Sequence, residues 1–114
     1  MIQVYGIPNC DSVKKLRSRL EAQHVDYRFH DYRKSGVPVD DLRQWVAVKG
    51  WEALLNRKGT TWRSLDDETK AGVANAETAI AVMLANPSTI KRPVLTDGKQ
   101  LFVGLDEAMA FGGH

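Results

Sequence analysis

The spacing of hydrophobic positions in the first third of the chain changes from strand-like to helical and back. Residues 2–5 are mostly β-branched or aromatic, which predicts a short strand. Residues 11–23 carry apolar side chains at helical spacing with basic residues between them, and Asn9 or Asp11 can cap that helix. Its apolar positions are Val13, Leu16 and Leu20. Residues 25–32 alternate in polarity, which predicts a second strand.

The middle of the chain, between about residues 39 and 86, is a block of helical patterns that follows a loop at residues 33–38. Its predicted helices are residues 39–48, residues 51–55, a helix opened by a Ser64–Asp67 capping box and ended near Gly72, and a helix capped by Asn75 and ended by Asn86 and Pro87. We expect this block to be an insertion, because strand patterns lie on both sides of it.

The last third of the chain returns to strands. Residues 92–96 and 100–104 flank an Asp97-Gly98 turn, which is the strongest hairpin signal in the sequence. A short helix is predicted at residues 106–111, and a frayed end at residues 112–114. The order β-α-β, helical block, β-β-α predicts an α/β fold. We expect a mixed four-stranded sheet whose first two strands are parallel, with a helical insertion between its halves.

Length and composition agree with one domain. The chain has 114 residues, of which 43% are hydrophobic, so we predict a single domain over residues 1–114 with its insertion at about 39–86. No apolar run approaches the roughly 18 residues that span a bilayer, and the start lacks the pattern of a secretory signal. A net charge of +2 is too small to indicate nucleic-acid binding. We therefore expect a cytoplasmic protein with no membrane or nucleic-acid partner.

The sequence holds one cysteine, Cys10, so it contains neither an internal disulfide nor a zinc site built from several thiolates. Cys10 falls where the first strand's loop meets the first helix, which is where open α/β sheets bind ligands. Unpaired N–H groups and the helix dipole would lower the pKa of a thiol there. Lys14 and Arg17 would lie on the same stripe of the helix. The other interpretation is a small buried hydrophobic residue.

Two further basic segments have two interpretations each. Arg92 and Pro93 begin a strand that should be central: a cis bond would turn the backbone toward the ligand site, or the pair is an ordinary strand start with a solvated arginine. Arg57, Lys58 and Arg63 form a solvated face unless the insertion folds back over the cysteine. The tryptophans are interpreted as packing residues: Trp45, Trp51 and Trp62. No residues have metal-ligand spacing, so no metal is predicted.

Three segments resemble the ArsC-like family in their residues, order and spacing, and are most similar to its YffB-like branch of glutathione-dependent thiol reductases. They are residues 5–15 (YGIPNCDSVKK), residues 51–62 (WEALLNRKGTTW) and residues 90–94 (IKRPV). Their order and spacing extend from residue 5 to residue 94, over most of the chain. The resemblance implies a thioredoxin-like fold with a helical insertion.

The resemblance also implies roles for individual residues. It makes Cys10 the nucleophile, and Arg57 and Arg92 match two arginines that arsenate reductases place around the thiolate and its oxyanion. Pro93 matches the cis-proline of thioredoxin-like folds. Arsenate reductases carry a third arginine on the last strand, but this strand reads LFVG, with Val103 near that place. The missing arginine counts against arsenate as the substrate.

We therefore expect a glutathione-dependent thiol reductase or transferase, with glutathione as co-substrate and no metal or prosthetic group. Because Cys10 has no second cysteine to resolve its adduct, an external thiol must do so. The expected substrate- and glutathione-binding residues are Asn9, Lys14, Arg57, Arg92 and Pro93. Glutaredoxin is a candidate recycling partner, and we expect a monomer.

Two alternatives remain open. One is arsenate reduction. The other is an Spx-like regulator, which binds RNA polymerase and senses oxidation through a Cys-x-x-Cys pair. Here the position three after the cysteine is Val13, so that switch is absent.

Overall fold

The computed structural model describes residues 1–111, and the frayed end predicted at residues 112–114 lies outside them. The described chain forms two compact units. One unit combines residues 1–36 with residues 92–111, and the other is Val37–Lys91. Within residues 1–111, no helix is both long enough and apolar enough to cross a membrane.

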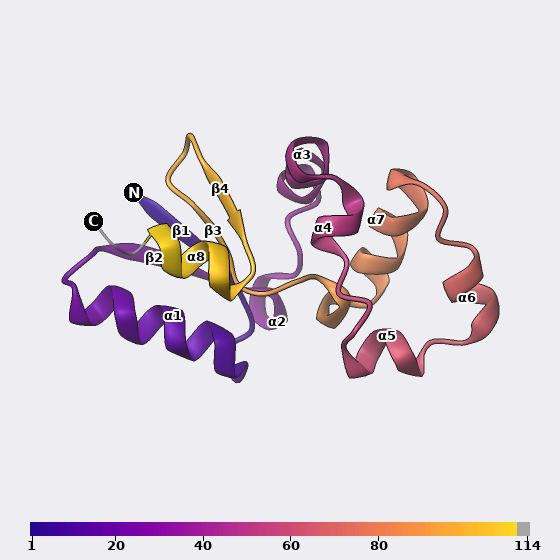
Figure 1. Cartoon of the computed structure of the whole chain (residues 1–114), viewed down its shortest axis with the longest axis horizontal. Coiled ribbons are helices and arrows are strands. Elements are labelled where there is room, and N and C mark those ends of the chain that lie inside the picture. Colours follow the sequence, from indigo (N-terminus) through magenta and orange to yellow (C-terminus); the bar gives the residue numbers. More distant parts are fainter. Residues whose placement is uncertain (112–114) are drawn as a thin grey trace. The chain divides into compact units, whose positions relative to one another are not determined.

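The first unit contains a mixed sheet. Its elements are β1 (Ile2–Gly6), α1 (Asp11–Ala22), β2 (Tyr27–Asp31), α2 (Tyr32–Ser35), β3 (Val94–Thr96), β4 (Leu101–Val103) and α8 (Leu105–Phe111), all shown in Figure 1. The strand order is β2-β1-β3-β4. The β1–β2 pair is parallel, and the β1–β3 and β3–β4 pairs are antiparallel. The predicted β-α-β and β-β-α order and the four-stranded mixed sheet are confirmed.

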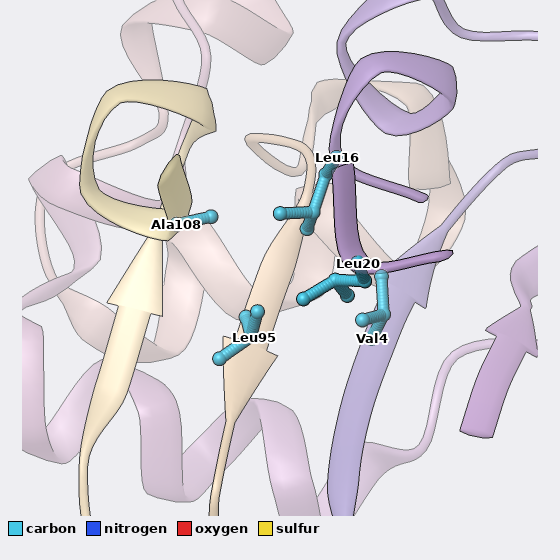
Figure 2. Packing of buried hydrophobic residues seen from close by; sticks show 5 residues of the cluster. All are labelled: Val4, Leu16, Leu20, Leu95 and Ala108. Atoms are coloured by element: carbon cyan, nitrogen blue, oxygen red, sulfur yellow. The ribbon is translucent and has the colours of Figure 1, made fainter. Parts of the chain in front are cut away.

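Helices α1 and α8 cover one face of this sheet. Side chains from both helices and from the two central strands meet there, as Figure 2 shows. The members of this cluster are Val4, Leu16, Leu20, Leu95 and Ala108, all fully buried. Val4 and Leu95 are partners in the β1–β3 register, so the two strands offer one apolar surface to the apolar stripe of α1. This packing fixes the start of α1 close to the end of β1.

The second unit is helical. Its elements are α3 (Val39–Lys49), α4 (Trp51–Leu54), α5 (Thr60–Ser64), α6 (Asp67–Ala71), α7 (Ala76–Ala85) and the 3-10 helix η1 (Pro87–Thr89). Helices α3, α4 and α7 pack on one another. Asn75 and Thr78 form a reciprocal capping box at the start of α7, which confirms Asn75 as its cap.

Two predicted caps are wrong. The N-cap of α1 is Cys10, in extended conformation and without a side-chain cap bond, rather than Asn9 or Asp11. Ser64 ends α5 and does not open α6. The N-cap of α6 is Asp66, whose Oδ1 accepts the Thr69 N–H at 2.7 Å. A carboxylate three residues before an unpaired helical N–H is the better acceptor, because that N–H lies within its reach.

The short helices α2, α5 and η1 are absent from the sequence prediction. The strand predicted to run through Tyr32 stops at Asp31, because the Asp31 carboxylate accepts the Arg33 N–H at 2.8 Å and starts α2. Each of these three helices is about one turn long and contains too few apolar positions to show a period.

Candidate active site

Cys10 stands where the loop after β1 becomes α1. Its N–H donates to the Ile7 carbonyl at 3.3 Å, and its own carbonyl accepts the Lys14 N–H at 2.9 Å. The loop is closed tightly, because a Cβ atom on Gly6 would lie 2.7 Å from Cγ2 of Val13. Only glycine permits so close an approach of the first turn of α1 to the end of β1. The backbone of the loop between β1 and α1 therefore holds Cys10 at the N-terminus of α1.

The groups that act on the thiol of Cys10 are the backbone N–H groups of Val13 and Ser12 and the side chain of Arg92. Burial raises the pKa of this thiol, but the Val13 N–H, the Arg92 side chain and the Ser12 N–H together lower it by more. The net pKa lies below the ordinary value of a cysteine. Cys10 is only partly buried, so a reactant can approach it. Cys10 is therefore not the small buried hydrophobic residue that the sequence left open as an alternative.

Arg92 reaches Cys10 through the pairing of β1 with β3. Tyr5 pairs with Val94, so the residues just before β3 lie at the sheet edge where β1 ends. The Arg92–Pro93 peptide bond is cis, as the resemblance implies. The Pro93 carbonyl accepts the Gly104 N–H at 2.8 Å, which ties the segment to the β4–α8 corner. Two residues far apart in sequence thus meet within the first unit.

Two cations of α1, Lys14 and Arg17, are not among the groups that lower the pKa of Cys10. Lys14 is exposed and is not among the groups that lower the pKa of Cys10. The Nε of Arg17 donates to the Tyr27 hydroxyl at 3.0 Å, and its guanidinium lies 4.1 Å from the Phe29 ring centroid. Arg17 therefore contacts the aromatic residues of β2, and it is not among the groups that lower the pKa of Cys10.

The remaining expected residues differ in their settings. Asn9 is exposed in the loop beside Cys10, and Pro93 is buried. Val103 is buried on β4, where it pairs with Val94, so this strand position offers no cation. Arg57 belongs to the second unit, where its guanidinium carbon lies 5.7 Å from the Trp51 ring centroid.

The unpaired N–H groups that the sequence predicts at the start of this helix are those of Ser12 and Val13, and they lower the pKa of Cys10 as expected. One contact of the second unit is not predicted from the sequence. Trp51 is interpreted from the sequence as a packing residue, yet it is half-buried and faces Arg57. Over residues 1–111, no group of three or more His, Cys, Asp or Glu side chains is placed to hold a metal ion.

The sequence pattern of the ArsC family matches residues 5–110, and the chain belongs to this family. A relative from Haemophilus influenzae, described as an uncharacterized protein, is 44% identical over 108 residues, which covers 94% of this chain and 93% of the relative. The global transcriptional regulator Spx of Streptococcus pyogenes is 25% identical over 109 residues, covering 94% of this chain and 80% of Spx.

Solved structures agree with this membership. A protein called YFFB superposes with a TM-score of 0.90 at 44% identity, covering 97% of this chain and 96% of that one. An arsenate reductase (ArsC) related protein from Brucella melitensis gives a TM-score of 0.76 at 43% identity, covering 98% and 92%. The thioredoxin-like fold expected from the resemblance is confirmed.

Proposed function

We propose that this ArsC-family protein is a glutathione-dependent thiol reductase or transferase in which Cys10 is the nucleophile. The observation that carries the proposal is the meeting of the Cys10 sulfur with two N–H groups of α1 and the Arg92 side chain. A thiolate is the reactive form of cysteine, and these donors stabilise it. The same donors stabilise Cys10 as a leaving group when its adduct is resolved.

The reaction needs two exchanges. The Cys10 thiolate attacks the glutathione sulfur of a mixed disulfide, an S–S bond to Cys10 forms, and the substrate leaves as a thiolate that takes a proton. A second glutathione thiolate then attacks the glutathione sulfur bound to Cys10, which releases glutathione disulfide and restores the Cys10 thiolate. In the net reaction the mixed disulfide and one glutathione become the free substrate thiol and glutathione disulfide. The substrate sulfur is reduced, the sulfur of the attacking glutathione is oxidised, and the first glutathione sulfur stays at the disulfide level. No second protein cysteine is required.

The binding roles follow from charge. Each glutathione carboxylate needs a cation, and Arg92, Arg57 and Lys14 are the proposed partners. Asn9 and Pro93, beside Cys10 and Arg92 in the sequence, complete the proposed binding residues. Glutaredoxin as a recycling partner, a monomeric state, a cytoplasmic location and the lack of a metal or prosthetic group belong to the same proposal.

Intact-protein mass spectrometry after incubation with glutathione disulfide tests the proposal. We expect one glutathionyl adduct, which must lie on Cys10 because the sequence has no other cysteine, and its loss on adding reduced glutathione. The Arg92→Met variant should form the adduct more slowly at neutral pH. A wild-type protein that stays unmodified while small alkylating agents still reach Cys10 would contradict glutathione as the co-substrate.

Arsenate reduction is the second candidate, favoured by the likeness to the Brucella melitensis protein. The buried Val103 on β4 leaves that strand position without a cation for the oxyanion. A coupled assay with arsenate, glutathione and glutaredoxin separates the two, because turnover of arsenate above that of the Cys10→Ser variant would support this candidate. Recovery of RNA polymerase in a pull-down, without thiol exchange, would instead support an Spx-like role.

A further inference from the structure

Arg57 lies on a turn with a fixed shape. The Asn56 Oδ1 accepts the Lys58 N–H at 3.2 Å, so the Asn56 side chain folds back under the turn. A Cβ atom on Gly59 would lie 2.8 Å from the Asn56 Nδ2, so any larger residue here would displace the Asn56 side chain. The backbone conformation around Arg57 is therefore determined by Asn56 and Gly59.

The base of this turn is anchored within the second unit. The Asn56 N–H donates to the Thr89 carbonyl at 2.7 Å, and the Lys91 N–H donates to the Leu54 carbonyl at 2.7 Å. Between these bonds Leu55 forms an antiparallel bridge with the fully buried Ile90. The segment that enters the turn, residues 54–56, is therefore held by its pairing with residues 89–91.

The Arg57 side chain is exposed and extends over the Trp51 ring at 5.7 Å from its centroid. Among the residues that the structure describes, no carboxylate pairs with Arg57. A guanidinium over an aromatic face keeps its N–H groups at its edge available to an acceptor. Within residues 1–111, Arg57 is thus a positioned cation with no carboxylate partner.

We propose that Trp51 is a positioning residue that holds the Arg57 guanidinium ready for a carboxylate of glutathione. This inference rests on the proposed function, which makes glutathione the ligand of Arg57. A long side chain loses rotamer freedom when it binds, and a contact that restricts it beforehand reduces that loss. Trp51 therefore acts on affinity through Arg57, without touching the reacting sulfur.

A double-mutant cycle with S-methylglutathione tests the inference. This probe keeps both carboxylates and has no free thiol, so its dissociation constant, measured by calorimetry, reports binding alone. We expect Trp51→Leu to weaken binding by about two- to fivefold, the range of an exposed cation–π contact. Trp51→Phe, which keeps a ring, should lose less. In an Arg57→Ala background, Trp51→Leu should not weaken probe binding further. The Trp51→Leu variant alone should keep the wild-type limiting rate of Cys10 glutathionylation.

Matched controls come from the same unit. Trp62→Leu removes another half-buried tryptophan and should weaken probe binding less than Trp51→Leu. Arg63→Ala removes another exposed cation and should weaken probe binding less than Arg57→Ala. Equal weakening by Trp51→Leu with and without Arg57 would overturn the inference, as would an Arg57→Ala variant that binds the probe normally. If Cys10 still forms its glutathione adduct in those cases, the proposed function stands. A wild-type protein that neither binds the probe nor forms the adduct would overturn both.

Discussion

The Val13 and Ser12 N–H groups and the Arg92 side chain lower the pKa of Cys10, because they stabilise its thiolate and not its thiol. We predict that Arg92→Met raises the pKa of Cys10 and moves the pH profile of alkylation by iodoacetamide to higher pH. Lys14→Met is the control, because Lys14 is not among the groups that lower this pKa. Thiolate absorbance in the ultraviolet provides the second measurement.

The direction of the pH dependence follows from the lowered pKa. Reactivity is present above the folded-state pKa of Cys10 and is lost as the pH falls through it. The contribution of the thiolate to the free energy of unfolding depends on pH in the same direction. This contribution is fully present above the pKa of the unfolded thiol, and it is lost as the pH falls through the pKa of the folded protein. An Arg92→Met profile that coincides with that of the wild type would contradict the assigned role of Arg92.

Gly104 combines an N–H donated to the Pro93 carbonyl at 2.8 Å with a φ of 88°. We predict that Gly104→Ala lowers the free energy of unfolding by about 1–2 kcal/mol, because a side chain is strained at positive φ. Urea denaturation measures this. Gly72→Ala is the matched control, since Gly72 has a φ of −75°, and its effect should stay within about 0.5 kcal/mol. Similar losses at both glycines would show that backbone conformation is not the cause.

At the scale of elements, the junction of β1 and α1 places Val13, and Val13 in turn supplies an N–H to Cys10. A Cβ atom on Gly6 would lie 2.7 Å from Cγ2 of the fully buried Val13, whose β-branched side chain has little freedom to turn away. We predict that Gly6→Ala lowers the free energy of unfolding by about 1–3 kcal/mol, as overpacking does. It should also raise the pKa of Cys10, because the first turn of α1 must shift. Urea denaturation and thiolate titration check the two effects.

The double variant Gly6→Ala/Val13→Ala distinguishes a clash from a general loss of packing. Removing the Val13 methyl groups frees the space that the new Cβ needs, so the double variant should recover part of the thiolate stabilisation. Val13→Ala alone is the control and should leave the Cys10 pKa near its wild-type value, because the donor is the backbone. A double variant less reactive than Gly6→Ala would contradict this account.

How far the sequence predicts the elements depends on their length. Helix α1 is predicted because Val13, Leu16 and Leu20 repeat over its full length and are all buried. Helix α5 is missed because its five residues contain no buried side chain and so no period. The sequence pattern assigns the cap of α6 to Ser64. Only the geometry shows that the Asp66 carboxylate meets the Thr69 N–H.

At the scale of the whole molecule, the candidate site brings together residues far apart in sequence. The sequence predicts Cys10 from its place at a helix start, but the physical pattern leaves Arg92 open between two interpretations. The β1–β3 pairing decides between them, because it puts the residues before Val94 beside those after Tyr5. The Trp51–Arg57 contact is missed because the two residues lie in different local structures, Trp51 in α4 and Arg57 in the turn after it, so no single period relates them.

The first unit is discontinuous, since the chain leaves it after residue 36 and returns at residue 92 to supply β3 between β1 and β4. Leu95 on β3 packs in the same cluster as side chains of α1 and α8. We predict that Leu95→Ala costs about 2–5 kcal/mol and raises amide hydrogen exchange in α1 and α8 as well as in the strands, because both parts of the chain share this core. Val48→Ala, at a side chain that is 64% exposed, should change stability by less than about 0.5 kcal/mol. Faster exchange confined to β3 and β4 would mean that residues 1–36 hold their structure without the returning strands.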